Sequence, residues 1–260
     1  MNRLDKELIA RNLVSSRTKA QELIEKGYVL VNGKQLNKTS FQVAETDKIE
    51  IKENEVLKYV SRGGLKLEKA IKVFNYSVKG KTIMDIGSST GGFTDCCLQN
   101  GAKKMICIDV GSNVMDATLR KDNRIELYEN TNIKDADSSL FNGIDLIVVD
   151  VSFISLERII ERVSGENIKV DIICLIKPQF ECGKEIAKKY NGVILNKTVH
   201  KDILKNVISK FAKNGFNLLG LDVSPIKGGD GNIEYLAYFT NKSDKSYAVN
   251  IEKTINNAFK

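Results

Sequence analysis

The sequence predicts an α/β protein in which a doubly wound domain, with a mostly parallel sheet, follows a small α+β domain. Three observations support this prediction. From residue 62 onward, strand-like runs alternate with helix-like runs, and a glycine-rich turn joins the first of these strands to a helix. Before residue 57, two helical patterns precede a hairpin pattern. We therefore expect a first domain at residues 1–56, a linker at 57–61 and a second domain at 62–260.

The first domain is expected to hold two helices and a small sheet. Apolar spacing and turn signals predict helices at 4–13 and 16–26 and strands at 28–31, 34–36 and 48–51. Ser15 or Ser16 caps the second helix, which ends before Gly27. Asn32-Gly33 is the preferred dipeptide of a tight hairpin turn.

Basic residues accompany these elements. Five cations on the helices and the hairpin make a credible RNA-binding face: Arg11, Arg17, Lys19, Lys34 and Lys38. Arg62, just after the linker, is a sixth candidate. The alternative is a docking or dimerisation module whose charges are merely solvated, because isolated Arg and Lys residues on helices are usually ordinary surface.

The second domain alternates strands with helices. Strands are expected at 82–85, 105–108, 125–127, 146–150, 171–176, 218–223 and 234–239. Helices are expected at 64–74, 93–100, 156–162 and 201–214. The last two strands flank a short loop and should pair antiparallel. An antiparallel final hairpin on an otherwise parallel sheet is the Rossmann-like layout of S-adenosylmethionine-dependent methyltransferases.

The glycine-rich turn at residues 85–95 suggests a nucleoside-bearing cofactor. Its spacing, D-x-G-x-x-x-G-G, is neither the dinucleotide fingerprint nor a P-loop, and a second acid, Asp109, ends the next strand, where it can accept hydrogen bonds from a ribose diol. S-adenosylmethionine fits this pair better than NAD or ATP; a plain tight turn is the alternative. The candidate cofactor residues are Asp85, Gly87, Ser88, Ser89, Gly91, Gly92, Phe93, Asp109 and Asn132.

Two lysines and two carboxylates are expected to meet at the edge of the sheet where the parallel strands end. Asp150 ends the fourth strand, Lys177 follows the fifth, and Glu234 begins the antiparallel last strand. Lys66 starts the helix that leads into the domain, where the helix dipole disfavours a cation. A set of surface salt bridges is the alternative.

Five strings carry a family resemblance. They are S-R-G-G-L-K-L at 61–67, the turn at 85–95, D-L-I-V-V-D-V-S-F-I-S-L at 145–156, L-I-K-P-Q-F-E at 175–181 and S-P-I-K-G-G-D-G-N-I-E at 224–234. With these strings the chain resembles the TlyA family, in which an S4 RNA-binding domain is fused to an FtsJ-type methyltransferase domain. Residues 16–34 closely resemble the S4 part. The linker at 57–60 and the segment 113–115 depart from the family pattern.

The resemblance implies ribose 2′-O-methylation of cytidine in ribosomal RNA of one or both subunits, with S-adenosylmethionine as cofactor. FtsJ-type enzymes use a Lys-Asp-Lys-Glu tetrad, which matches Lys66, Asp150, Lys177 and Glu234. A lysine acts as a base only when burial or a neighbouring cation favours its neutral form. We assign Lys177 as the base and Lys66 as the neighbouring cation, while Asp150 and Glu234 orient the lysine and the hydroxyl.

Composition limits the alternatives. The net charge of +7 favours a polyanionic partner, and five cysteines without a C-x-x-C pair indicate reduced thiols rather than disulfides or a metal site. The single histidine, His200, is interpreted as a helix-capping or surface residue. With no signal pattern or spanning run, we expect a cytoplasmic protein without a membrane partner. The rival functions are a non-catalytic ribosome assembly factor and a membrane-active haemolysin; oligomeric state is not indicated.

Overall fold

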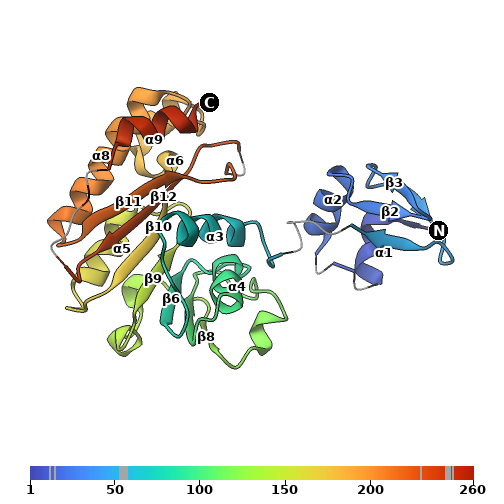
Figure 1. Cartoon of the computed structure of the whole chain (residues 1–260), viewed down its shortest axis with the longest axis horizontal. Coiled ribbons are helices and arrows are strands. Elements are labelled where there is room, and N and C mark those ends of the chain that lie inside the picture. The colour runs from blue at the N-terminus through green and yellow to red at the C-terminus, as the bar shows by residue number, and fades with distance from the viewer. Residues whose placement is uncertain (12, 15, 53–57, 229, 244–246, 248) are drawn as a thin grey trace. The chain divides into compact units, whose positions relative to one another are not determined.

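The computed structural model describes the chain except for residues 12, 15, 53–57, 229, 244–246 and 248. It divides the chain into two compact units, Met1–Arg62 and Gly63–Lys260 (Figure 1). Leu57, the first residue of the expected linker, lies outside the described residues, as does Ser15, one of the two expected caps. The linker at 57–61 and its domain boundaries stay predictions.

The first unit contains the predicted helices and hairpin. Its elements are β1 (Asn2–Arg3), α1 (Leu4–Ala10), α2 (Arg17–Glu25), β2 (Val29–Val31), β3 (Lys34–Leu36), β4 (Gln42–Val43) and β5 (Ile49–Ile51). β2 pairs antiparallel with both β3 and β5, and β1 pairs with β4. Strands as short as β1 and β4 carry no readable periodicity, which is why the sequence did not predict them.

Local chemistry explains where these elements begin and turn. The Ser16 side chain caps α2 by accepting a hydrogen bond from the backbone N–H of Lys19, as expected for one of the two candidate caps. Asn32 and Gly33 have φ of 51° and 78°, the left-handed conformation that a tight hairpin turn needs. Both helices turn apolar side chains onto the sheet, and the core between them includes Leu4, Leu8, Leu23, Ile24 and Val29.

The second unit is built on a seven-stranded sheet in the order β11-β12-β10-β9-β6-β7-β8. Its strands are β6 (Thr82–Ile86), β7 (Lys104–Ile108), β8 (Ile125–Tyr128), β9 (Leu146–Val149), β10 (Asp171–Ile176), β11 (Asn217–Val223) and β12 (Tyr235–Thr240). β12 runs antiparallel to β10 and β11, and the other neighbours are parallel. The predicted antiparallel hairpin on a parallel sheet is confirmed.

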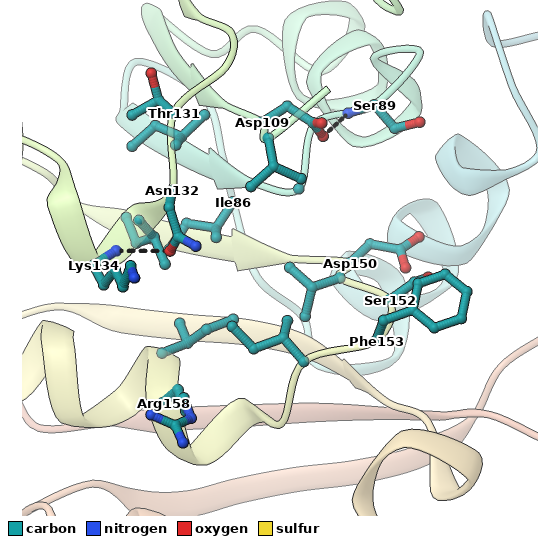
Figure 2. A pocket seen from close by; sticks show the side chains of 17 residues that line it. Ile86, Ser89, Asp109, Thr131, Asn132, Lys134, Asp150, Ser152, Phe153 and Arg158 are labelled. Atoms are coloured by element: carbon teal, nitrogen blue, oxygen red, sulfur yellow. Dashed lines mark hydrogen bonds between the residues drawn. The ribbon is translucent and has the colours of Figure 1, made fainter. Parts of the chain in front are cut away.

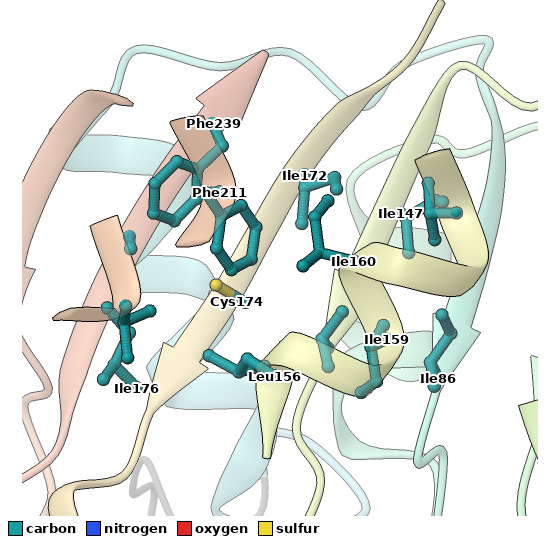
Figure 3. Packing of buried hydrophobic residues seen from close by; sticks show 14 of the residues in the cluster. Ile86, Ile147, Leu156, Ile159, Ile160, Ile172, Cys174, Ile176, Phe211 and Phe239 are labelled. Atoms are coloured by element: carbon teal, nitrogen blue, oxygen red, sulfur yellow. The ribbon is translucent and has the colours of Figure 1, made fainter. Parts of the chain in front are cut away.

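Helices cover both faces of this sheet. They are α3 (Gly63–Val73), α4 (Gly92–Gln99), α5 (Leu156–Ser164), α6 (Pro178–Glu181), α7 (Gly183–Lys189), α8 (Lys197–Lys213) and α9 (Ile251–Ala258). On one face, α5 and α8 bury apolar side chains against β10 and β12, where the rings of Phe211 and Phe239 stack at 3.9 Å (Figure 3). On the other face, α3 and α4 pack against each other.

The longest helix starts earlier than its sequence pattern predicted. α8 begins at Lys197 because the Asn196 side chain accepts hydrogen bonds from the backbone N–H groups of Thr198 and Val199. His200 therefore lies within the helix, fully buried, and its ring nitrogens contact the Tyr235 hydroxyl at 2.7 Å and the Ile194 carbonyl at 2.9 Å. The interpretation of His200 as a capping or surface residue is wrong.

Candidate active site

A cavity of about 640 Å³ opens at the carboxyl edge of the sheet, which is the edge where the parallel strands end (Figure 2). Its volume lies within the range of ligand-binding pockets, roughly 300–1,000 Å³. Loops that follow β6, β7, β8 and β9 line it. Five of the residues singled out from the sequence are in the lining: Gly87, Ser89, Asp109, Asn132 and Asp150.

The glycine turn allows two loops to pack closely. Gly87 has φ of +82°, and a Cβ on it would lie 2.8 Å from Cγ1 of Val151 and 2.9 Å from the carbonyl oxygen of Asp150. A side chain at this position would push apart the loops that follow β6 and β9. Gly91, with φ of +93°, packs in the same way against Leu119. Of the two glycines, only Gly87 lines the cavity, so its close packing helps to set the shape of the cavity wall.

Asp109 ties the loops after β6 and β7 together. Its Oδ2 accepts a hydrogen bond of 2.7 Å from the backbone N–H of Ser89, and its Oδ1 accepts one of 2.6 Å from that of Gly111 (Figure 2). Each carboxylate oxygen keeps a further lone pair. Asp109 can therefore accept hydrogen bonds from a diol in the cavity without breaking these contacts.

Asp85 lies behind the cavity wall, not in it. Its Oδ2 accepts a 2.6 Å hydrogen bond from the hydroxyl of Thr94, while its buried Oδ1 has no partner among the described residues. Burial raises the pKa of this carboxyl to about 7, against the hydrogen bond from Thr94, and the nearby carboxylates of Asp150 and Asp109 act in the same direction as burial. The hydroxyl of Ser88 is also buried without a described partner.

Four other candidate residues do not line the cavity. Ser88 and Gly91 belong to the turn, and Gly92 and Phe93 are buried in the first turn of α4. Their contact with a cofactor stays a prediction. Six further lining residues were not singled out from the sequence, because none of them belongs to the glycine turn, to the acids at strand ends or to the tetrad: Val110, Thr131, Lys134, Ser152, Phe153 and Arg158. Val110 directly follows Asp109, and Ser152 and Phe153 lie in the string at 145–156, so their places in the sequence could have indicated them.

The four tetrad residues form two close lysine–carboxylate pairs. Nζ of Lys177 lies 2.6 Å from Oδ1 of Asp150, and Nζ of Lys66 lies 2.6 Å from Oε2 of Glu234. Side-chain exposure is 9% for Lys177 and 3% for Glu234, so these are not the solvated surface pairs of the alternative interpretation.

Strand register brings the two pairs to one place. Ile176, the last residue of β10, is opposite Tyr235, the first residue of β12. Lys177 follows Ile176 and Glu234 precedes Tyr235, so both residues lie at the carboxyl edge of the sheet. Asp150 reaches the same edge because β9 runs parallel to β10. The fold thus places the two lysines and the two carboxylates at the carboxyl edge of the sheet, as the sequence predicted.

Comparisons with known proteins agree with this geometry. A model described as FtsJ-like methyltransferase matches residues 59–241, and an S4 domain model matches residues 2–49. The 16S/23S rRNA (cytidine-2′-O)-methyltransferase TlyA of Mycobacterium tuberculosis is 34% identical over 94% of this chain and 91% of its own length. The chain belongs to the TlyA family.

Other members of the TlyA family carry a different name. Hemolysin A of Brachyspira hyodysenteriae is 44% identical over 91% of this chain and 99% of its own length. A solved structure from Streptococcus thermophilus, titled as a hemolysin, is 37% identical and matches with a TM-score of 0.76 over 98% of this chain and 94% of that one. In the part of the chain that the structure describes, no helix is long and apolar enough to cross a membrane.

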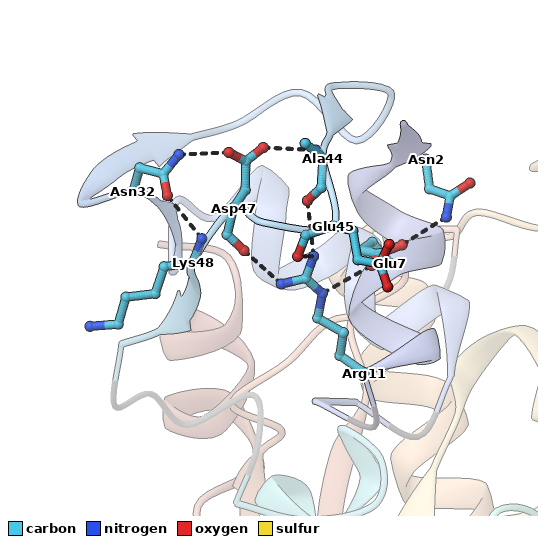
Figure 4. Close-up of polar contacts among 8 residues, drawn as sticks. All are labelled: Asn2, Glu7, Arg11, Asn32, Ala44, Glu45, Asp47 and Lys48. Atoms are coloured by element: carbon cyan, nitrogen blue, oxygen red, sulfur yellow. Dashed lines mark hydrogen bonds and ion pairs between the residues drawn. The ribbon is translucent and has the colours of Figure 1, made fainter.

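Three of the candidate RNA-binding cations bind to groups of the first unit, Met1–Arg62. Arg11 donates to the Glu7 carboxylate and to the backbone carbonyls of residues 44, 45 and 47 (Figure 4). Arg17 pairs with the buried Asp5, and Lys19 donates to the Tyr59 carbonyl.

The other three candidates are exposed: Lys34, Lys38 and Arg62. Contact of any of the six cations with RNA stays a prediction.

Proposed function

We propose that this protein transfers a methyl group from S-adenosylmethionine to the ribose 2′-hydroxyl of cytidine in ribosomal RNA. The observation that carries the proposal is the two lysine–carboxylate contacts at the carboxyl edge of the sheet, each with one buried member, because such groups can orient and deprotonate a hydroxyl. The name of the Mycobacterium tuberculosis relative supports the same nucleotide and the same ribose position. Since its substrate is ribosomal RNA, we place the protein in the cytoplasm.

The residues around the cavity fit S-adenosylmethionine. Asp109 offers acceptors for a ribose diol, and the side chain of Asn132 faces the same cavity from the loop after β8 (Figure 2). The Asp85 carboxyl behind the wall, whose Oδ1 has no partner among the described residues, supplies negative charge when ionised, which suits a cofactor that carries a sulfonium and an ammonium. No residue in the lining forms a phosphate-binding turn, in keeping with a cofactor that lacks phosphates.

When bound, S-adenosylmethionine supplies an electrophilic methyl group, so the protein mainly has to activate and position the hydroxyl. Lys177 is the proposed base. Its contact with Asp150 stabilises the ammonium form, so the lysine must lose one proton before it can accept that of the hydroxyl. Asp150 keeps Nζ of Lys177 at the edge of the cavity, and Glu234 holds Lys66 as the neighbouring cation.

The proposal is tested by transfer of labelled methyl from S-adenosylmethionine to purified 30S and 50S subunits. Wild-type protein should label rRNA of at least one subunit, and Lys177→Ala should lower transfer by at least about a hundredfold, the usual contribution of a general base. The variant should bind the cofactor like wild type. If wild-type protein binds cofactor but labels neither subunit, the enzyme assignment fails and a non-catalytic assembly factor becomes the better account.

A further inference from the structure

Ser152 contacts the proposed base, yet the tetrad does not include it. Its hydroxyl accepts a hydrogen bond of 3.2 Å from Nζ of Lys177 and lines the cavity. Ser152 is exposed, whereas Lys177 is buried. This hydroxyl therefore touches the buried ammonium on one side and can reach water on the other.

The loop that carries Ser152 is held in a strained conformation. Phe153 has φ of +66°, a left-handed conformation that costs a bulky residue roughly 1–2 kcal/mol. Backbone strain of this kind persists only where the surroundings impose it, and it concentrates at functional sites. The strain occurs one residue beyond Ser152 and three beyond Asp150, at the point where the chain leaves β9.

Contacts with the segment after β10 tether this loop. The Phe153 ring is 90% exposed but lies 4.9 Å from the ring of Phe180. The Glu181 carboxylate, next to Phe180, accepts hydrogen bonds of 2.8 Å from the Ser155 hydroxyl and 2.7 Å from the Leu156 backbone N–H. Because Lys177 begins this same segment, these contacts hold Ser152 and Lys177 in a fixed relation.

The contacts of Nζ of Lys177 limit the routes by which its proton can leave. Its described partners are the Asp150 carboxylate, the Ser152 hydroxyl and the Phe180 ring at 5.9 Å. Asp150 has to stay ionised to hold the lysine, and an aromatic ring accepts no proton. A hydroxyl can accept one hydrogen bond while it donates another, so it can pass a proton on without changing its own charge.

We propose that Ser152 orients Lys177 and passes its proton to solvent, an inference that rests on the proposed function. Oγ of Ser152 takes a proton from Nζ while its own hydroxyl proton goes to water, which leaves a neutral amine. That amine then takes the 2′-hydroxyl proton as the ribose oxygen bonds to the methyl carbon. The carbon–sulfur bond breaks with its electron pair on sulfur, and the lysine returns to its charged form.

The test is the pH dependence of kcat for wild type, Ser152→Ala and Ser152→Thr. Ser152→Ala should lower kcat by about tenfold to a hundredfold, as expected for a lost hydrogen bond to a charged group. The rising limb of the profile should move to lower pH, because Nζ of Lys177 loses an acceptor that stabilises its charged form. The KM for rRNA and the Kd for S-adenosylmethionine should not change. Ser152→Thr keeps the hydroxyl and should restore both kcat and the profile.

Two further variants keep the test decisive. Ser152→Cys is close to serine in size but hydrogen-bonds weakly, so it should behave like Ser152→Ala even if the alanine variant folds poorly. Ser164→Ala is the control. It removes the hydroxyl of a serine in α5 that donates to the Glu161 carbonyl and to the Asn214 side chain, and the pH profile of this variant should match that of wild type.

An unchanged kcat profile in Ser152→Ala, or a raised KM for rRNA with unchanged kcat, would overturn the inference while wild-type transfer keeps the proposed function intact. Absence of transfer by the wild-type protein itself would instead count against the proposed function.

Discussion

At the scale of single residues, Asp85 shows how burial can prepare a carboxyl for a cationic ligand. The Asp85 side chain is fully buried, and one of its oxygens has no partner among the described residues. An isolated buried charge is costly, which is the reason that its pKa rises to about 7. A positively charged cofactor nearby would favour the ionised form and reverse part of this shift.

Cofactor affinity should therefore depend on pH. Below about pH 7 the free protein holds a proton on Asp85 that binding must release, so affinity should increase with pH, by up to about tenfold from pH 6 to pH 8. Calorimetric titration with S-adenosylmethionine in buffers of different ionisation enthalpy measures both the affinity and the released proton. Asp85→Asn cannot titrate and should bind with an affinity that hardly changes over this range. A flat profile for wild type would refute this role of Asp85.

At the scale of elements, the turn between β6 and α4 is positioned by backbone packing. Gly87 approaches the carbonyl oxygen of Asp150, so the glycine turn and the loop that holds the tetrad carboxylate share one wall. Asp109 adds a side-chain tie from the loop after β7. The cofactor cavity and the catalytic edge thus depend on the same three loops.

Substitution of Gly87 should damage both stability and cofactor binding. Gly87→Ala adds a clash to the strain of a positive φ, so the free energy of unfolding should fall by about 2–4 kcal/mol. Gly143→Ala is the matched control, because Gly143 has φ of +72° with nothing within 4 Å of the added Cβ, and it should cost about 1–2 kcal/mol. Urea unfolding of both variants gives the comparison. Equal losses would mean that the close approach to Asp150 contributes nothing.

At the scale of the whole molecule, long-period features were predictable and local ones were not. The positions of the strands and the antiparallel final hairpin followed from runs of apolar residues, whereas the order of the seven strands was not predicted. Asp150, Lys177 and Glu234 stood out as polar residues at the ends of those runs, and the family resemblance added their roles and that of Lys66. α6 and α7 were missed because Pro178 and Gly183 break the helical pattern. The internal contacts of Arg11 were also not predicted, since apart from Glu7 its acceptors are backbone carbonyls more than thirty residues away.

The net charge of +7 on the whole chain is expected to matter where its cations are exposed. Changing Lys34 and Lys38 together to Glu should lower rRNA affinity and reduce the salt dependence of binding by about two phosphate contacts, with cofactor affinity unchanged. The control makes the same charge change at Lys169 and Lys213, two exposed lysines of the second unit near the starts of β10 and β11, at the edge of the seven-stranded sheet away from the cavity. Equal effects of the two double variants would indicate a general charge effect instead of an RNA-binding face.

The central claim is that the methyl group goes to a ribose oxygen of cytidine in ribosomal RNA. The most direct measurement is mass spectrometry of nucleosides from subunits that have reacted with the protein and S-adenosylmethionine. The account predicts new 2′-O-methylcytidine, which is absent when Lys177→Ala replaces the wild-type protein. A methyl group on a base, or on the ribose of another nucleoside, would contradict it.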